Sequence, residues 1–308
     1  MSLYAFSGAI ELGLVYGLMA LGVYLTFRVL DFPDLTVDGS LTLGAAVSAI
    51  CITKGLNPFL SLIPAMTAGF MAGTVTGFLT TKLKILHLLS SILTMTALYS
   101  VNIRVMGGRP NIALLGRPTV FDPIRALNVS PFLVSNILFI VLAVVVVSGL
   151  IWLIRTEYGQ ALLATGANPK MITSLGVNTH FTTITGVGIS NALVALSGAL
   201  IAQNQGTADV GMGVGTIVAG LASIVVGETI FNSRRITTIV ISVVLGSVIY
   251  RLAIAAALNL KFAGRSFEPS DLKLLTAALV VASLVLPRIR QSFRSKGGGG
   301  GGREKGGK

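Results

Sequence analysis

Three carboxylates lie close together in the stretch VLDFPDLTVDGSLTLG, residues 29 to 44, which separates two apolar runs. They belong to Asp31, Asp34 and Asp38. Pro33 disfavours a helical conformation at the residue before it, so the pattern predicts a break in a helix at this point. Charges inside a membrane are costly and usually functional, so these acids are candidates for gating or binding in a transport path.

Two interpretations of this stretch remain open. It is either a cytoplasmic turn with solvated acids, or a broken helix that lines a transport path with Asp38 nearest the gate. Gly39 permits a left-handed turn, and Asp38 or Ser40 can cap a short helix over 40 to 53. That helix would extend only ~21 Å, less than the ~30 Å of hydrocarbon. The short segment that follows favours the broken helix, in which irregular backbone would be buried in protein or line a cavity.

The residue types needed for catalysis or metal binding do not occur together in this sequence. His87 and His180 are far apart, and the single cysteine, Cys51, lies in an apolar run. The ending GREKGGK fits the phosphate-loop pattern, but no strand precedes it and no Ser or Thr follows. We therefore expect no enzyme activity, metal site or cofactor in this chain.

The composition indicates an integral membrane protein. Mean hydropathy is +0.85 and charged residues make up 11% of the chain, against about 25% in soluble domains. The sequence lacks the alternating pattern of a membrane barrel. It predicts an all-α polytopic bundle with about eight to ten transmembrane segments, including broken or half helices. Long segments are expected at 5–30, 57–81, 86–106, 132–154, 181–203 and 236–258, and shorter ones at 40–53, 215–231 and 272–287.

Basic residues indicate the orientation. Residues 288–308 carry seven Lys and Arg and end in the Gly-rich sequence SKGGGGGGREKGGK, so we expect a disordered cytoplasmic tail after a membrane domain over 1–287. The same side would hold 28–39, 82–85, 155–180 and 233–235, and then 14 of the 23 Lys and Arg. The net charge of +12 therefore reflects topology and not nucleic-acid binding. We expect a multi-pass membrane protein in contact with lipid, with its C-terminus in the cytoplasm.

Polar residues within the apolar segments are the remaining candidates for the transport path. Glu11 lies in the middle of the first segment, where it either serves the path or is protonated or paired. Glu228 precedes Arg234 and Arg235, which favours a structural salt bridge. The loop 107–131 is expected outside, where a binding-protein contact and a solvated loop are equal alternatives. The candidates for the path are Glu11, Asp38, Ser40, Asn102, Asn191, Gln203 and Asn204.

The loop over residues 155–180 predicts two capped helices. The first covers 157–165 and ends at Gly166, and the second covers 169–175 and ends at a glycine cap, Gly176. Asn168 is a good N-cap for the second helix, and Pro169 suits its first position. The pattern places three apolar residues on one side of this helix: Met171, Ile172 and Leu175. That side would enter a groove on a partner protein, or it would pack on the bundle or the membrane interface.

The loop resembles the coupling-helix region of ABC importer permeases of the branched-chain amino acid and ribose class, which has the pattern G-x-A-L-x-A-x-G-x-N-P and then L-G-V/I-N. The matching residues are Gly159, Ala161, Leu162, Ala164, Gly166, Asn168, Pro169, Leu175, Gly176, Val177 and Asn178. The segments DFPDLTVDGSLTLGAA, GLASIVVGETIF, VLGSVIYRLAIA and DLKLLTAALV look like one branch of that class, which works with binding proteins for tryptophan or tyrosine.

The resemblance implies the permease subunit of an ATP-driven importer in the bacterial plasma (inner) membrane, which works by alternating access. Its partners would be a second permease copy, a cytoplasmic ABC ATPase dimer that holds ATP and Mg²⁺, and an extracytoplasmic binding protein. The solute would be an amino acid, aromatic in preference. The alternatives are an ABC permease for a sugar or nucleoside, and an ion-coupled secondary transporter. The residues implied in ATPase coupling are Gly159, Ala164, Gly166, Asn168, Pro169, Met171, Ile172, Leu175 and Gly176.

Overall fold

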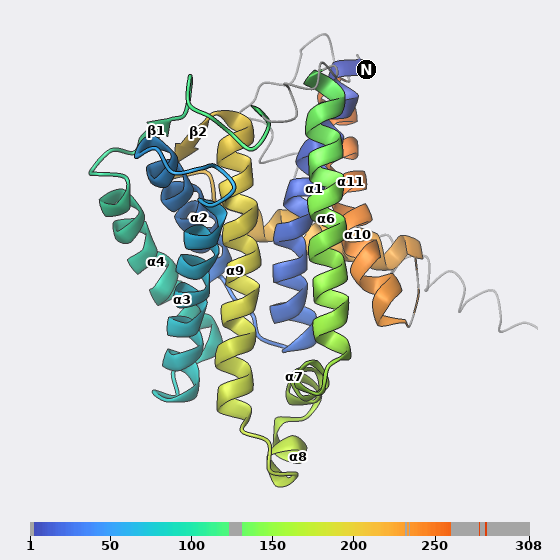
Figure 1. Ribbon diagram of the computed structural model, residues 1–308. Coiled ribbons are helices and arrows are strands. Elements are labelled where there is room, and N and C mark those ends of the chain that lie inside the picture. The colour runs from blue at the N-terminus through green and yellow to red at the C-terminus, as the bar shows by residue number, and fades with distance from the viewer. Residues whose placement is uncertain are drawn as a thin grey trace, which may run out of the picture.

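The structure is a computed structural model that describes residues 3–122, 131–231, 233 and 235–259, together with 277 and 281 (Figure 1). Its described part is a bundle of helices with one pair of very short strands. The helices are α1 (Leu3–Tyr24), η1 (Leu25–Val29), α2 (Thr36–Thr53), α3 (Leu62–Thr81), α4 (His87–Val105), α6 (Pro131–Arg155), α7 (Glu157–Ala167), α8 (Pro169–Ser174), α9 (Thr179–Gln205), α10 (Thr216–Phe231) and α11 (Ile236–Asn259).

The predicted all-α membrane fold is confirmed. Seven described helices are long and apolar enough to cross a membrane, and α10 is a shorter apolar helix. Of the ninth predicted segment, 272–287, only residues 277 and 281 are described, and the tail 288–308 lies outside the described residues. The expected short helix over 40–53 is wrong at its start, because α2 already begins at Thr36. Its 18 residues extend ~27 Å, close to the thickness of the hydrocarbon.

Helix α9 lies at the centre of the bundle, between α1, α2 and α3 (Figure 1). Small residues let the backbones meet there. A Cβ added to Gly44 of α2 would lie 2.0 Å from the carbonyl oxygen of Ala195, and one added to Gly198 of α9 would lie 1.9 Å from that of Leu41. Such close approach drives helix association in lipid, where no water is excluded.

Helices α1 and α11 pack antiparallel to each other. A Cβ added to Gly13 would lie 2.6 Å from the Cα atom of Val248, and one added to Gly17 would lie 3.1 Å from the Val244 side chain. This antiparallel register fixes which residues of α11 lie at the same height in the bundle as which residues of α1.

The two ends of the bundle differ. At one end, called the strand end, β1 (Asn111–Ala113) pairs antiparallel with β2 (Thr207–Asp209). Helices α7 and α8 lie at the opposite end, called the α8 end (Figure 1). The sequence analysis did not predict these strands, since each has three residues and the pair joins segments that lie far apart in the chain.

Candidate transport and coupling sites

The predicted break after the first span is present at residues 30–35, between η1 and α2. Its left-handed residue is Asp31, with φ 51°, and not Gly39 as expected. Gly39 lies inside α2, where an added Cβ would meet the side chain of Leu98 at 2.8 Å. Helix α2 begins at Thr36, about one helical turn before the predicted start at residue 40. The Asp34 carboxylate holds this start, since it accepts a 2.9 Å hydrogen bond from the amide of Thr36.

Asp34 is fully buried in the described structure, at 0% exposure. Its second carboxylate oxygen accepts a 2.7 Å hydrogen bond from the Asn191 amide of α9. Asn191 lies 12 residues after the start of α9 and 14 before its end, so Asp34 ties the break to the middle part of α9. Asp31 is exposed, whereas Asp34 is not, so a turn with three solvated acids does not describe this stretch.

Asp38 holds the beginning of another helix. Its carboxylate accepts hydrogen bonds from the amide of Gly215 at 2.7 Å, the hydroxyl of Thr216 at 3.0 Å and the amide of Ile217 at 2.9 Å. These groups form the N-terminal turn of α10, where unpaired N–H groups and the helix dipole favour a negative charge. The prediction that Asp38 caps the helix over 40–53 is therefore wrong: Asp38 caps α10.

A glycine approaches the same place from the α10 side. A Cβ added to Gly213 would lie 1.9 Å from the Asp38 carbonyl oxygen. The Gly213 amide also donates a 3.2 Å hydrogen bond to the hydroxyl of Thr42. The segment before α10 thus lies directly on the first turns of α2, and sequence reasoning missed Gly213 because nothing local marks a contact with a segment more than 170 residues away.

Ser40 and Asn102 lie buried near the start of α2. The Asn102 amide donates a 3.2 Å hydrogen bond to the carbonyl of Gly39. The Asn102 Oδ1 atom and the Ser40 hydroxyl have no hydrogen-bond partner in the described structure. These two side chains and Asn191 therefore come from three helices to the region of the break, and their role in the path stays a prediction.

Gln203 lies apart from these residues, near the strand end of α9. Its side-chain oxygen accepts a 3.0 Å hydrogen bond from the amide of Val120, and its amide donates to the hydroxyls of Ser48 at 3.1 Å and Ser61 at 3.3 Å. The side chain ties a loop to α2 and to the turn before α3. Asn204 follows it and is half-buried, as is Glu11 on α1. The seven path candidates therefore do not form one cluster.

The two capped helices of the coupling loop are present as α7 and α8. The Asn168 side chain accepts a 3.1 Å hydrogen bond from the Met171 amide, and Pro169 begins the helix, as predicted. Gly176 has φ +87°, which fits its predicted cap. Helix α7 ends at Ala167, one residue beyond Gly166. Local capping chemistry therefore determines this part of the fold.

Helix α7 is fixed to the bundle through glycines. A Cβ added to Gly166 would lie 2.0 Å from the carbonyl oxygen of Val29, at the end of η1, and one added to Gly159 would lie 2.2 Å from the Leu153 carbonyl oxygen. The Tyr158 hydroxyl also hydrogen-bonds Thr185 of α9. Burial raises the pKa of the Tyr158 phenol, so this group stays neutral.

Helix α8 presents a smaller apolar surface than predicted. Met171 is 49% exposed and Leu175 is 71% exposed, but Ile172 is buried and does not share their face. The Val177 amide donates to the Ile172 carbonyl in the cap that closes the C-terminal end of α8. Phe181, at the start of α9, is 58% exposed and adds an apolar side chain that the sequence analysis missed. We call Met171, Leu175 and Phe181 the tip surface.

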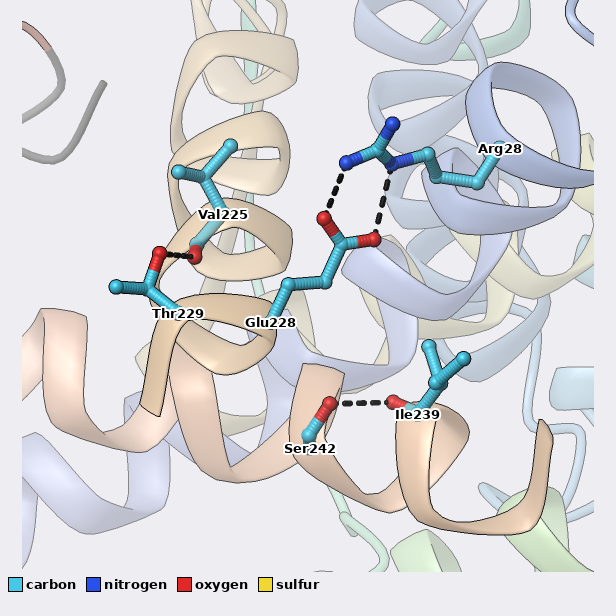
Figure 2. A network of polar contacts seen from close by, with 6 residues as sticks. All are labelled: Arg28, Val225, Glu228, Thr229, Ile239 and Ser242. Atoms are coloured by element: carbon cyan, nitrogen blue, oxygen red, sulfur yellow. Dashed lines mark hydrogen bonds and ion pairs between the residues drawn. The ribbon is translucent and has the colours of Figure 1, made fainter. Parts of the chain in front are cut away.

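Glu228 forms a salt bridge, as predicted, but with a different partner. Its partner is Arg28 of η1 and not Arg234 or Arg235 (Figure 2). The Nε and Nη2 atoms of Arg28 donate to the two carboxylate oxygens of Glu228. Arg234 lies outside the described residues. The pair connects η1 to the last turns of α10, and both side chains are partly exposed. Sequence reasoning missed Arg28 because it lies 200 residues from Glu228.

Reversal of one charge in this pair is expected to weaken the contact between η1 and α10. Arg28→Glu alone and Glu228→Arg alone should each lower the free energy of unfolding by about 0.5 to 1 kcal/mol, because the pair is partly exposed. The double variant Arg28→Glu/Glu228→Arg should recover most of that loss. Thermal unfolding of the purified chain in detergent would measure this double-mutant cycle. Additive losses in the double variant would contradict the pairing.

Comparisons with known proteins give the family. The family model described as "Branched-chain amino acid transport system / permease component" matches residues 6–284. A tyrosine transport system permease protein of Clostridioides difficile is 39% identical over 91% of this chain and 90% of its own length. A ribose import permease protein of Haemophilus influenzae is 24% identical over 64% of this chain and 60% of its own.

A solved structure, PsaBC from Streptococcus pneumoniae in complex with Fab, has a similar fold, with a TM-score of 0.52 and 14% identity over 92% of this chain and 91% of that one. The bundle, its α7–α8 projection and these matches agree with one another. The chain therefore belongs to the family of branched-chain amino acid transport permease components, a family of multi-pass membrane transport proteins and not of enzymes.

Proposed function

We propose that the chain is the permease subunit of an ATP-driven ABC importer. The observation that carries the proposal is the tip surface. It lies at the α8 end, on α8 and the start of α9. Helix α7, which precedes α8, meets the backbones of η1 and α6 at two glycines and hydrogen-bonds α9 through Tyr158. An exposed apolar patch on a rigid projection is suited to a groove on a partner protein, and an ABC ATPase subunit is the partner that this family membership favours. ATP and Mg²⁺ would then bind to that subunit.

The proposal orients the chain with its α8 end in the cytoplasm and its strand end outside. A binding protein would deliver the solute at the strand end, where Arg109 and Arg117 are exposed. The membrane is proposed to be the plasma membrane of a bacterium. In this orientation the N-terminus of α1 lies outside. The Lys and Arg distribution supports the same assignment.

The transport path is proposed to pass the loop before α10. This loop leaves β2, descends towards Asp38 and is not helical, and its residues Gly211, Val214 and Gly215 are exposed. The loop has only the six residues 210–215, and it runs through successive turns from β2 to the first turn of α2, where Asp38 lies. Irregular backbone at membrane depth must line a water-filled cavity or face protein. A second permease copy across this face would enclose such a cavity.

The solute is proposed to be an amino acid with an aromatic side chain. The relative from Clostridioides difficile is a tyrosine transport permease, and the chain resembles it over nearly its whole length. Ribose permeases are more distant, at 24% identity for the one from Haemophilus influenzae. L-tyrosine is therefore the first solute to test, followed by other amino acids.

Coupling to an ATPase is tested by a charge on the tip surface. Leu175→Asp should remove the ABC ATPase subunit from affinity-purified complexes, because a carboxylate would be buried in an apolar contact. Leu115→Asp is the matched control, since Leu115 is 87% exposed but lies at the strand end. Mass spectrometry of the purified complex would measure both. An ATPase that remains bound to the Leu175→Asp variant in normal amount would contradict the docking site.

The transport function is tested in proteoliposomes with the ATPase and the binding protein. Uptake of L-tyrosine should require ATP on the side of the ATPase. Uptake that continues without ATP under an ion gradient would contradict the proposal and favour a secondary transporter.

A further inference from the structure

An arginine lies inside the membrane-spanning part of α11, and none of the described residues forms an ion pair with it. Arg251 belongs to the span Ile236–Ala257. Its Nε atom is buried and has no hydrogen-bond partner. Within the described ranges no carboxylate forms an ion pair with it, and this includes Glu11 of the neighbouring α1. A charged side chain in a membrane span is rare and usually marks a site of function.

The guanidinium group of Arg251 stacks on an aromatic ring. Its central carbon lies 3.7 Å from the centroid of the Tyr16 ring of α1. This is a cation–π contact, which is stronger away from water than at an exposed site. The ring covers one part of the guanidinium and makes no hydrogen bond to its N–H groups. Both residues are half-buried, so the site is neither sealed in the core nor fully open to lipid.

The guanidinium points into the membrane and not towards the nearer surface. From the contacts of Gly13 with Val248 and Gly17 with Val244, the Cα atom of Arg251 is level with about Ile10 of α1. That is only ~6 Å from the start of the α1 span, within reach of an arginine side chain seeking water. The side chain instead meets Tyr16, whose backbone lies ~9 Å deeper along α1.

The direction of the Arg251 side chain follows from helix geometry. Side chains of a helix tilt towards its N-terminus, and the N-terminus of α11 lies at the inner side of this pair. Tyr16 tilts the opposite way because α1 runs antiparallel to α11. The two side chains therefore approach each other between the levels of Ile10 and Tyr16. The ring holds the guanidinium in place, and the Nε donor has no acceptor among the described residues.

We propose that Arg251, supported by the Tyr16 ring, binds the carboxylate of the transported solute. The proposal rests on the function proposed above, an amino-acid permease, and assigns a residue to recognition of the solute. A guanidinium offers two parallel N–H donors that match the two oxygens of a carboxylate. Every amino acid carries that group, whereas ribose does not. The site therefore separates amino acids from neutral sugars within the family.

The test uses the complete complex of permease, ATPase and binding protein in proteoliposomes. It measures L-tyrosine taken up per ATP hydrolysed. Arg251→Gln should lower this ratio at least ~10-fold, while ATP hydrolysis stimulated by the binding protein stays within ~2-fold of the original. Arg251→Lys should give an intermediate ratio, because it keeps the charge but loses the paired donors. Tyr16→Leu should lower the ratio ~2- to 5-fold, and Tyr16→Phe should leave it unchanged.

Arg104→Gln is the matched control, since Arg104 is exposed at the end of α4 and loses the same charge. An unchanged ratio in Arg251→Gln would overturn the proposal. If that variant does not assemble, unchanged ratios in Arg251→Lys and Tyr16→Leu would overturn it equally. Loss of assembly in all three would also overturn it, because the pair would then be structural. Failure of the unaltered complex to take up L-tyrosine with ATP would instead contradict the proposed function.

Discussion

Replacement of Gly166 by leucine is expected to abolish transport while the protein still inserts into the membrane. Even a methyl group at this position would lie 2.0 Å from the carbonyl oxygen of Val29 and 2.9 Å from the Cα atom of Leu30. Both atoms belong to backbone, which cannot move aside as a side chain can. Helix α7 must therefore shift away from η1. Overpacking of this kind costs about 1 to 3 kcal/mol, and separation of the two elements removes the path by which α8 moves η1.

The measurement is ATP-dependent uptake of solute at equal amounts of membrane protein. Gly149→Leu serves as the control, because Gly149 is exposed on α6 and an added Cβ there has no neighbour within 4 Å. We expect Gly149→Leu to transport normally and Gly166→Leu to retain less than about a tenth of the rate, which corresponds to ~1.4 kcal/mol. Gly166→Ala should fall between them. Normal transport by Gly166→Leu would show that α7 is not coupled to η1 through this contact.

Four contacts connect α7, η1, α2 and α10 in sequence and then return to η1. Gly166 joins α7 to η1, and the break at residues 30–35 joins η1 to α2. Asp38 joins α2 to the start of α10, and Glu228 near the end of α10 returns to Arg28 of η1. If the chain works as proposed, a displacement of α8 would reach both ends of α10 through these contacts.

The coupling loop could be predicted from the sequence almost residue by residue. Asn168, Pro169 and Gly176 act on the backbone within a few residues of themselves, so their effect is local and can be read from the sequence. Ile172 was predicted to be exposed with Met171 and Leu175, but it is buried. Spacing along a helix does not determine which side another segment will cover.

The position of the break after the first span was predicted from the sequence, but the contacts that hold it were not. Pro33 indicates the interruption, since its effect on the preceding residue is local. The groups that Asp38 caps lie 177 to 179 residues further along the chain, and the partner of Asp34 lies 157 residues away. The η1 segment, Leu25–Val29, is a π-helix that no pattern in the sequence indicated. These features come from tertiary contacts, which a single sequence does not reveal.

Removal of the Asp38 charge is expected to release the start of α10. In Asp38→Asn, one oxygen remains for three donors, and the new NH₂ group faces at least one of the backbone amides of Gly215 and Ile217. An N–H at this helix N-terminus then loses both its hydrogen bond and the charge that complements the dipole. We expect the free energy of unfolding to fall by about 1 to 2 kcal/mol, since the cap is partly exposed. Thermal unfolding of the purified chain in detergent would measure the change.

Asp31→Asn is the matched control for this prediction. It removes the same charge from the same stretch, but Asp31 is exposed, and asparagine tolerates its left-handed conformation of φ 51°. The control should unfold within about 0.5 kcal/mol of the original. Cysteines introduced at Val214 and Val218, which are 65% and 41% exposed, should also label faster in Asp38→Asn, because the turn that holds them is loosened. Equal stability of Asp38→Asn and Asp31→Asn would show that Asp38 does not hold the start of α10. The contacts that connect α7 to α10 would then be interrupted between α2 and α10.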